Sequence, residues 1–173
     1  MIEKPKNLEP TFYYTPYIQA AEGKGLIESL WMSKSELAFL IDGLDDQMSN
    51  FKYAEGKWTI KQVLQHVCDC ERIFSYRALR FSRRDKTVLP GFEENDYAQN
   101  DNSETLDLRD IKDEFIAVRQ ASITLFKYMD PESLDFLGNA NGLELTPRAL
   151  GWIISGHTIH HCKIIKERYL SLT

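Results

Sequence analysis

The sequence has few cysteines, no long apolar run and no excess of basic residues, and each shortage excludes a class of protein. Its 173 residues include only three cysteines, Cys68, Cys70 and Cys162. Three thiols cannot all pair, and a chain of this length can build a sizeable core without disulfides, so we expect reduced thiols and a cytoplasmic location. No stretch approaches the roughly 20 apolar residues of a membrane helix, and the N-terminal segment lacks the apolar part of a secretion signal.

Positive charge is also in short supply. The chain has 21 Lys and Arg against 26 Asp and Glu, which gives a net charge of −5. Because nothing global attracts phosphate backbones or anionic lipid, we expect neither nucleic acid nor a membrane as a partner. Hydrophobic residues make up 43% of the chain, which is too many for a disordered protein. These figures predict one domain spanning residues 1–173.

Alternation of apolar and polar residues, the pattern of a half-buried strand, is missing, whereas apolar residues recur at steps of three and four in four segments. The predicted helices cover residues 25–44, 59–82, 106–129 and 147–170. Thr59 and Gln62 form a capping box that begins the second helix, and Thr146-Pro147 begins the fourth. Helices of about 20 residues with one apolar face each can bury those faces only against one another, which predicts an all-α four-helix bundle.

Two connections are longer or more irregular than a simple bundle needs. The connection between the second and third helices, residues 85–104, is polar and contains Pro90-Gly91. It is too long for a bare connection, so a lid, an extra short helix and an irregular loop are all open alternatives. Residues 130–146 are rich in glycine and asparagine and predict a further irregular, turn-rich connection.

The four histidines lie in only two of the predicted helices, His66 in the second and His157, His160 and His161 in the fourth. At roughly 100° per residue, His157 and His161 lie about 40° apart and straddle the middle of the apolar stripe, whereas His160 lies on its flank. Their β-carbons are about 6 Å apart, so both rings can reach one ion through bonds of roughly 2.0–2.1 Å. His66, at the edge of its own stripe, is the histidine available as a third ligand.

The same residues allow other interpretations. Core histidines can be satisfied by hydrogen bonds to carbonyls or to a carboxylate such as Asp69, which otherwise faces solvent, and then bind no ion. Unsatisfied nitrogens of two packed neutral rings would cost on the order of 1 to 3 kcal/mol each, however, which favours a shared cation. Cys70 lies one turn after His66, so a closed zinc site of His66, Cys70, His157 and His161 is a further alternative to a packing role for this cysteine.

Three segments together resemble the DinB-like family of four-helix proteins: KWTIKQVLQH (57–66), PGFEENDY (90–97) and GHTIHH (156–161). The resemblance covers roughly residues 20–169. It implies a bundle that holds a divalent metal ion, often zinc or nickel, through three histidines that map onto His66, His157 and His161. It also implies frequent homodimers. The 90–97 segment is expected either to border the pocket, with Glu93 or Asp96 near the ligands, or to be an exposed acidic loop.

A three-histidine ion with an exchangeable water can support hydrolysis or can direct a low-molecular-weight thiol at a small-molecule substrate. The DinB-like family includes thiol-dependent transferases and isomerases, and the sequence does not choose between these reactions or indicate further catalytic residues. Three hypotheses therefore stand. They are a metal-dependent enzyme, a hydrolase or a thiol transferase; a non-catalytic binding or sensing module that contains metal; and a structural bundle without metal.

Large apolar residues also lie on the side of the fourth helix opposite its core stripe. They are Trp152, Ile159 and Leu170. Apolar groups on the back of a bundle helix lie either beneath loops or against another subunit, and we expect a homodimer.

Overall fold

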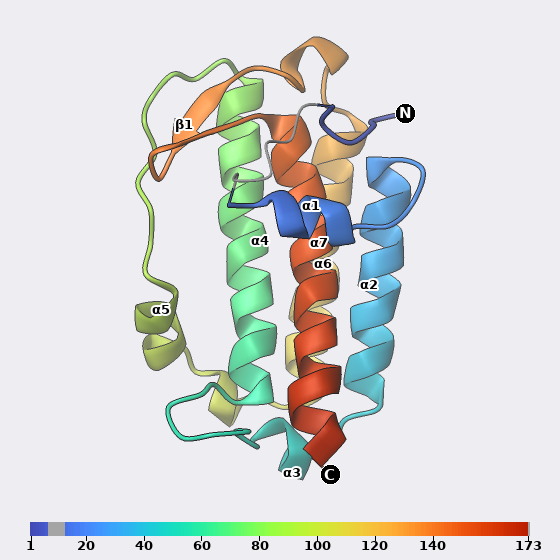
Figure 1. Ribbon diagram of the computed structural model, residues 1–173, viewed down its shortest axis with the longest axis vertical. Coiled ribbons are helices and arrows are strands. Elements are labelled where there is room, and N and C mark those ends of the chain that lie inside the picture. The colour runs from blue at the N-terminus through green and yellow to red at the C-terminus, as the bar shows by residue number, and fades with distance from the viewer. Residues whose placement is uncertain (7–12, 173) are drawn as a thin grey trace.

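The computed structural model describes residues 1–6 and 13–172, most of which are helical (Figure 1). The α-helices are α1 (Thr15–Ala20), α2 (Leu26–Asp42), α3 (Asp46–Ser49), α4 (Ile60–Ser82), α5 (Glu94–Asn100), α6 (Leu108–Lys127) and α7 (Pro147–Ile164). Two short antiparallel strands, β1 (Gly138–Ala140) and β2 (Leu143–Leu145), precede α7. Within this part of the chain, every helix is too short or too polar to cross a membrane.

The four long helices α2, α4, α6 and α7 form a four-helix bundle, which confirms the predicted fold class. Around the bundle, α2 contacts α7, α7 contacts α4, α4 contacts α6, and α6 contacts α2. The first two long helices in the sequence, α2 and α4, therefore face each other across the bundle instead of packing as neighbours. The short helix α1 crosses over α7 on the outside, and α5 lies beside α4 (Figure 1).

The capping signals in the sequence place the starts of two helices. The Thr59 hydroxyl accepts a hydrogen bond from the Gln62 amide at 3.1 Å, and the Gln62 side chain accepts one from the Thr59 amide at 3.0 Å, which completes the predicted capping box. The Thr146 hydroxyl accepts a bond from the Ala149 amide at the start of α7. At its other end α7 does not continue as an α-helix to residue 170. It passes into a π-helical turn over Ile165–Tyr169.

Both irregular connections contain secondary structure. In one it was an open alternative from the sequence, and in the other it was not predicted. The 85–104 connection contains α5 and a 3-10 turn over Ser103–Thr105, so the short-helix alternative holds. The 130–146 connection contains the β1–β2 hairpin, a correction to the expectation of no strand. Leu89 donates a hydrogen bond to the Asn139 carbonyl and accepts one from the Asn141 amide, so the two connections support each other.

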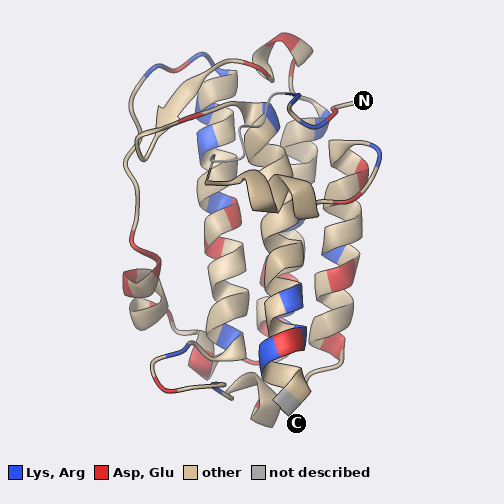
Figure 2. Cartoon of the chain, viewed as in Figure 1, with Lys and Arg blue, Asp and Glu red and all other residues tan. Residues whose placement is uncertain are grey.

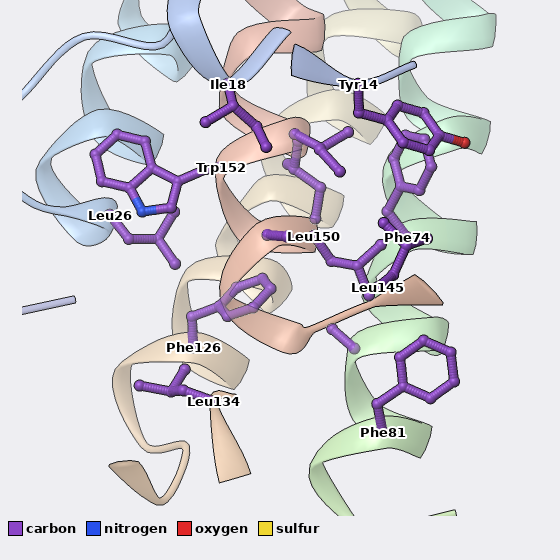
Figure 3. Close-up of a cluster of buried hydrophobic side chains, with 14 of the residues drawn as sticks. Tyr14, Ile18, Leu26, Phe74, Phe81, Phe126, Leu134, Leu145, Leu150 and Trp152 are labelled. Carbon is purple, nitrogen blue, oxygen red and sulfur yellow. The ribbon is translucent and has the colours of Figure 1, made fainter. Parts of the chain in front are cut away.

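The apolar core consists of two clusters separated by a layer of polar residues. Figure 3 shows one cluster, with Leu150 of α7 lying between Trp152 and Leu26 on one side and Phe74 of α4 on the other. The second cluster contains Leu37, Val67 and their neighbours at the other end of the bundle. Serines, a threonine and a buried ion pair lie between the two, namely Ser29, Ser33, Glu71, Arg119, Ser155 and Thr158.

The N-terminal segment covers the back of α7. Trp152 is only 1% exposed, and its indole Nε1 donates a hydrogen bond to the Glu3 carbonyl at 3.0 Å. The ammonium group of Lys4 lies over the same ring at 5.2 Å. Trp152 therefore lies beneath the chain's own N-terminus, and it no longer supports a subunit interface. The homodimer stays a prediction.

Candidate metal centre

Three histidines meet between α4 and α7. His66 Nε2 lies 3.2 Å from His157 Nε2, and His161 Nε2 lies 3.1 Å from the same atom. The three side chains are 5–9% exposed. The structure thus brings together all three residues that the sequence singled out, including His66, which the helical projection placed only at the edge of its stripe.

The spacing of these nitrogens fits a shared cation. Two imidazole nitrogens bound to one zinc or nickel ion through bonds of roughly 2.0–2.1 Å lie roughly 2.9–3.4 Å apart, depending on the coordination angle. Both measured separations fall within this range. His161 Nδ1 is buried and has no hydrogen-bond partner among the described residues, so internal hydrogen bonding does not satisfy the cluster.

The electrostatics favour neutral rings that keep a lone pair for a ligand bond. Burial lowers the pKa of His66 to about 4, with a smaller effect from His160. Burial likewise holds the pKa values of His157 and His161 well below that of an exposed imidazole, and the neighbouring rings add to the effect. A metal ligand must be the unprotonated imidazole, and the site supplies that form.

Aromatic rings wall the cluster on several sides. The Tyr17 ring of α1 packs edge-on to His157 at 5.4 Å, and the Trp58 ring lies 5.0 Å from His66. Phe74 of α4 lies 6.1 Å from His157. These rings hold the imidazoles in place. His160, which is half-buried, packs on Tyr17 and His161 but does not join the three nitrogens, as its position on the flank predicts.

A second group of possible ligands shares His66. Among the described residues, two sets of three side chains bring ligand atoms within 4.8 Å of one another, the three histidines and the set His66, Cys70 and Glu94. Cys70 Sγ lies 3.6 Å from both ring nitrogens of His66. Because Cys70 belongs to a different set from His157 and His161, the closed four-ligand zinc site does not form. Burial raises the pKa of the Cys70 thiol, which favours its packing role.

Acidic side chains border His66 on the α5 side. The 90–97 segment does border the site, at a gap too narrow for a water molecule that is lined by His66, Asp69, Phe92, Glu94, Tyr97 and Asp101. Asp69 accepts a hydrogen bond from Gln65 at 3.3 Å and lies 3.6 Å from Arg72. In the described part of the chain it therefore pairs with these two residues and not with His66. Burial raises the pKa values of both Asp69 and Glu94.

Two features of the site were not found from the sequence. Glu94, and not Glu93 or Asp96, is the carboxylate that approaches His66, because the Glu93 side chain caps α5 through the Asn95 amide. The buried Arg119–Glu71 pair also escaped notice, with nitrogen-to-oxygen distances of 2.8 Å. A signal for it exists, since Arg119 lies four residues from both Phe115 and Ile123 on the apolar stripe of α6.

Relatives among curated proteins match part of the chain. A protein named "Putative metal-dependent hydrolase" from Geobacillus thermodenitrificans is 27% identical over 96 residues, which cover 56% of this chain and 54% of that protein. A similarly named protein from Geobacillus kaustophilus is 28% identical over 89 residues, 51% of this chain and 50% of that protein. The chain therefore spans about half the length of the curated relatives it matches.

A solved structure and a family model match a larger share of this chain. The fold is similar to that of YfiT from Bacillus subtilis, described as "a probable metal-dependent hydrolase with an unusual four-helix bundle topology", with a TM-score of 0.66 and 18% identity over 95% of this chain and 92% of that one. The sequence model of the DinB superfamily matches residues 32–165, which include α4, α7 and all three clustered histidines. The chain belongs to the DinB superfamily.

Proposed function

We propose that this protein is a metal-dependent hydrolase that acts on a small molecule, with one divalent ion, zinc or nickel, held by His66, His157 and His161. The observation that carries the proposal is the convergence of three neutral, buried imidazoles, with the Nε2 atoms of His66 and His161 at 3.2 and 3.1 Å from that of His157. Borderline metals such as zinc and nickel suit imidazole ligands. The names of the Geobacillus and Bacillus relatives support the same reaction class.

The number of protein ligands favours a catalytic centre over a structural one. Structural zinc sites are closed by four protein ligands, whereas catalytic sites have three and keep one position open. Here the candidate fourth ligand, Cys70, lies in a separate group with His66 and Glu94. When bound, the ion would supply Lewis-acid chemistry and a water with its pKa lowered to about 7.

The chain's own residues position the three histidine ligands and border the site around them. His157 and His161 project from consecutive turns of α7, so one rigid helix fixes two ligands, and α4 supplies the third. Tyr17 and Phe74 pack on His157, and Trp58 packs on His66, which holds these rings in position. Asp69 and Glu94 lie beside His66 at a gap too narrow for a water molecule, so their carboxylates close this side of the site.

The test is a hydrolysis screen of tag-free protein loaded with zinc or nickel, run with and without a low-molecular-weight thiol. The panel comprises carboxylic esters, phosphate esters and amides. We expect hydrolysis of at least one class without thiol, and a loss of about 100-fold in His157→Ala, since losing a ligand removes the ion. The matched control His160→Gln changes a neighbouring histidine outside the three-nitrogen cluster and keeps the activity.

Other outcomes overturn the proposal in favour of a named alternative. Turnover that requires the thiol and consumes it identifies a thiol transferase. A bound ion with no turnover, together with a ligand that raises the melting temperature, identifies a sensing module. Wild-type protein that takes up no ion identifies a structural bundle.

A further inference from the structure

A pocket of about 240 Å³ borders the histidine cluster at His161, whereas the acidic gap borders it at His66. It lies between the loop that precedes α4 and the end of α7 with the π-helical turn that follows it, which Figure 1 shows at the same end of the bundle. This volume is below the 300–1,000 Å³ of pockets for drug-sized ligands, so it suits a small metabolite. We call it the Lys57–Arg168 pocket, after the two charged side chains that line it.

The charge of this pocket is opposite to that of the whole chain. Both charged residues in its lining are cations and no carboxylate lines it, although the chain carries a net charge of −5. Within the described chain, neither Lys57 nor Arg168 has a carboxylate oxygen within 4.0 Å, and the neighbouring Glu167 pairs with Lys163 instead. Figure 2 shows both basic and acidic residues on the last turns near the C-terminus, and of these Arg168 lines the pocket.

Aromatic side chains hold the guanidinium of Arg168 in place. Its Nη1 donates a hydrogen bond to the Tyr53 hydroxyl at 3.3 Å, and the group lies 5.9 Å from the centre of that ring. Tyr53 packs edge-on against Tyr169 at 4.8 Å, and the Tyr169 hydroxyl donates to the Trp58 carbonyl at 2.8 Å. A guanidinium fixed in this way has donors left over for an anion, and its planar fork matches an oxyanion.

The pocket is continuous with the candidate metal centre. His161 is one of its lining residues, and Trp58, another, packs on His66 at 5.0 Å. A molecule bound there would therefore reach the edge of the cluster with one end and the two cations with the other. Tyr53, Trp58 and Tyr169 give the pocket a largely aromatic wall.

We infer that the Lys57–Arg168 pocket binds the oxyanion of the substrate, a carboxylate or a phosphate on a small molecule with a planar apolar part. The orientation of the bound substrate in this inference rests on the proposed function. Binding of the anion rests on the pocket alone. Lys57 supplies a point charge, and Arg168 supplies paired donors. The aromatic wall packs on the apolar part, and the bond to be broken points toward His161.

The test is a binding titration followed by NMR on the full-length protein, with benzoate, phenylphosphonate and neutral benzamide as probes. Benzoate and benzamide have nearly the same shape and differ in charge. We expect one of the two anions to bind at least about tenfold more tightly than benzamide, which corresponds to one charge-assisted contact. The tighter anion shows whether carboxylate or phosphate is preferred. Arg168→Gln and Lys57→Gln should each remove most of this preference, while Lys163→Gln, on the last turn of α7 but outside the pocket lining, should keep it.

Equal binding of benzamide, or an anion preference that persists in both Arg168→Gln and Lys57→Gln, would overturn the inference. His157→Ala separates this result from the proposed function. It removes a predicted metal ligand that does not line the pocket, so the anion preference should persist in this variant. A preference that disappears in His157→Ala places the anion on the metal ion and not on the cations, which also overturns the inference. If no substrate is hydrolysed but the anion preference persists, only the proposed hydrolase function is contradicted.

Discussion

At the scale of single residues, the site depends on imidazoles that stay neutral although three of them meet. Burial accounts for most of this effect, since it disfavours the charged form of each ring. Mutual repulsion adds to it, because a proton on one ring raises the cost of a proton on the next. The same property that prepares the rings for a metal ion makes the folded protein sensitive to acid.

Metal-free protein should therefore lose stability as the pH falls from about 6.5 to about 4. In this window the unfolded chain takes up a proton on His66 near its ordinary pKa of about 6.5. In the folded chain the same ring stays neutral until the pH approaches about 4, the pKa that burial imposes. Since the unfolded state binds more protons, the free energy of unfolding falls with pH, by up to about 3 kcal/mol from His66.

Urea unfolding of chelator-treated protein at pH values from 7.5 to 4 measures this slope. Asp69 and Glu94 have raised pKa values and act in the opposite direction near the acid end, so the comparison with His66→Gln isolates the histidine. The variant should show a shallower slope than the wild type. Parallel curves for the two proteins would contradict the pKa assigned to His66.

Sequence reasoning at this scale succeeded where spacing within one helix decides the geometry. His157 and His161 lie on one face because they are four residues apart, and this follows from helix geometry alone. The approach of His66 and Glu94 depends on how separate elements pack, which a helical projection cannot show. Glu93, Glu94 and Asp96 are equivalent in the sequence; the capping role of Glu93 in α5 sets that residue apart, and only the position of α5 brings Glu94 instead of Asp96 to His66.

At the scale of elements, a glycine on α7 allows α1 to lie directly against the helix that carries two of the histidines. A β-carbon at Gly156 would lie 1.7 Å from the carbonyl oxygen of Tyr17, which is a backbone atom. The close approach brings the Tyr17 ring onto His157 at 5.4 Å. Gly156 thus completes one wall of the site, although it is not itself a ligand.

Gly156→Ala should force α1 away from α7 and destabilise the protein by about 1 to 3 kcal/mol, the usual cost of overpacking. The matched control is Gly43→Ala at the C-terminal end of α2. A β-carbon there meets its nearest atom at 3.5 Å, an ordinary contact, so stability should change little. Thermal unfolding compares the two variants. Equal melting temperatures would show that α1 does not lie on Gly156.

The ends of α2, α4 and α6 were predictable to within two residues because capping residues and apolar spacing are local signals, whereas α7 ends six residues before the predicted residue 170. Thr59 and Gln62 form the predicted capping box, and Thr146 caps α7. The β1–β2 hairpin was missed because strands of three residues are too short for an alternating pattern. The π-helical turn after Ile164 gives no pattern distinct from that of an α-helix.

At the scale of the whole molecule, one buried ion pair joins all four helices of the bundle. Arg119 of α6 is fully buried and pairs with Glu71 of α4. The same guanidinium donates hydrogen bonds to the Leu30 carbonyl and Ser33 hydroxyl of α2 and to the Thr158 hydroxyl of α7. Thr158 follows His157 directly, so this network fixes the spacing between the helices that carry the histidines.

Arg119→Met should cost about 3 to 5 kcal/mol, since it leaves the carboxylate of Glu71 buried without its partner. For a chain of this size, that loss lowers the melting temperature by roughly 6–20 °C. The double variant Arg119→Met with Glu71→Met removes both charges and should lose less than the two single variants together. The control Lys163→Met breaks an exposed pair with Glu167 and should change stability by less than about 1 kcal/mol. Additive losses in the double variant would contradict a coupled pair.

The arrangement of the whole bundle lay beyond sequence reasoning. Apolar stripes show that four helices pack together but do not specify which are neighbours, and here α2 and α4 lie across from each other. The apolar back of α7 shows the same limit. The sequence left loops and another subunit as alternatives, and Trp152 lies beneath the N-terminal segment because residues far apart in the chain meet there.

The measurement that tests the central claim most directly is the metal content of protein purified without an affinity tag and analysed by elemental mass spectrometry. Wild type, His157→Ala and the control His160→Gln are compared at equal protein concentration. A three-histidine centre predicts about one zinc or nickel ion per chain in the wild type and in His160→Gln, and almost none in His157→Ala. Wild-type protein that stays far below one ion per chain after reloading, or His157→Ala that keeps its ion, would contradict the account.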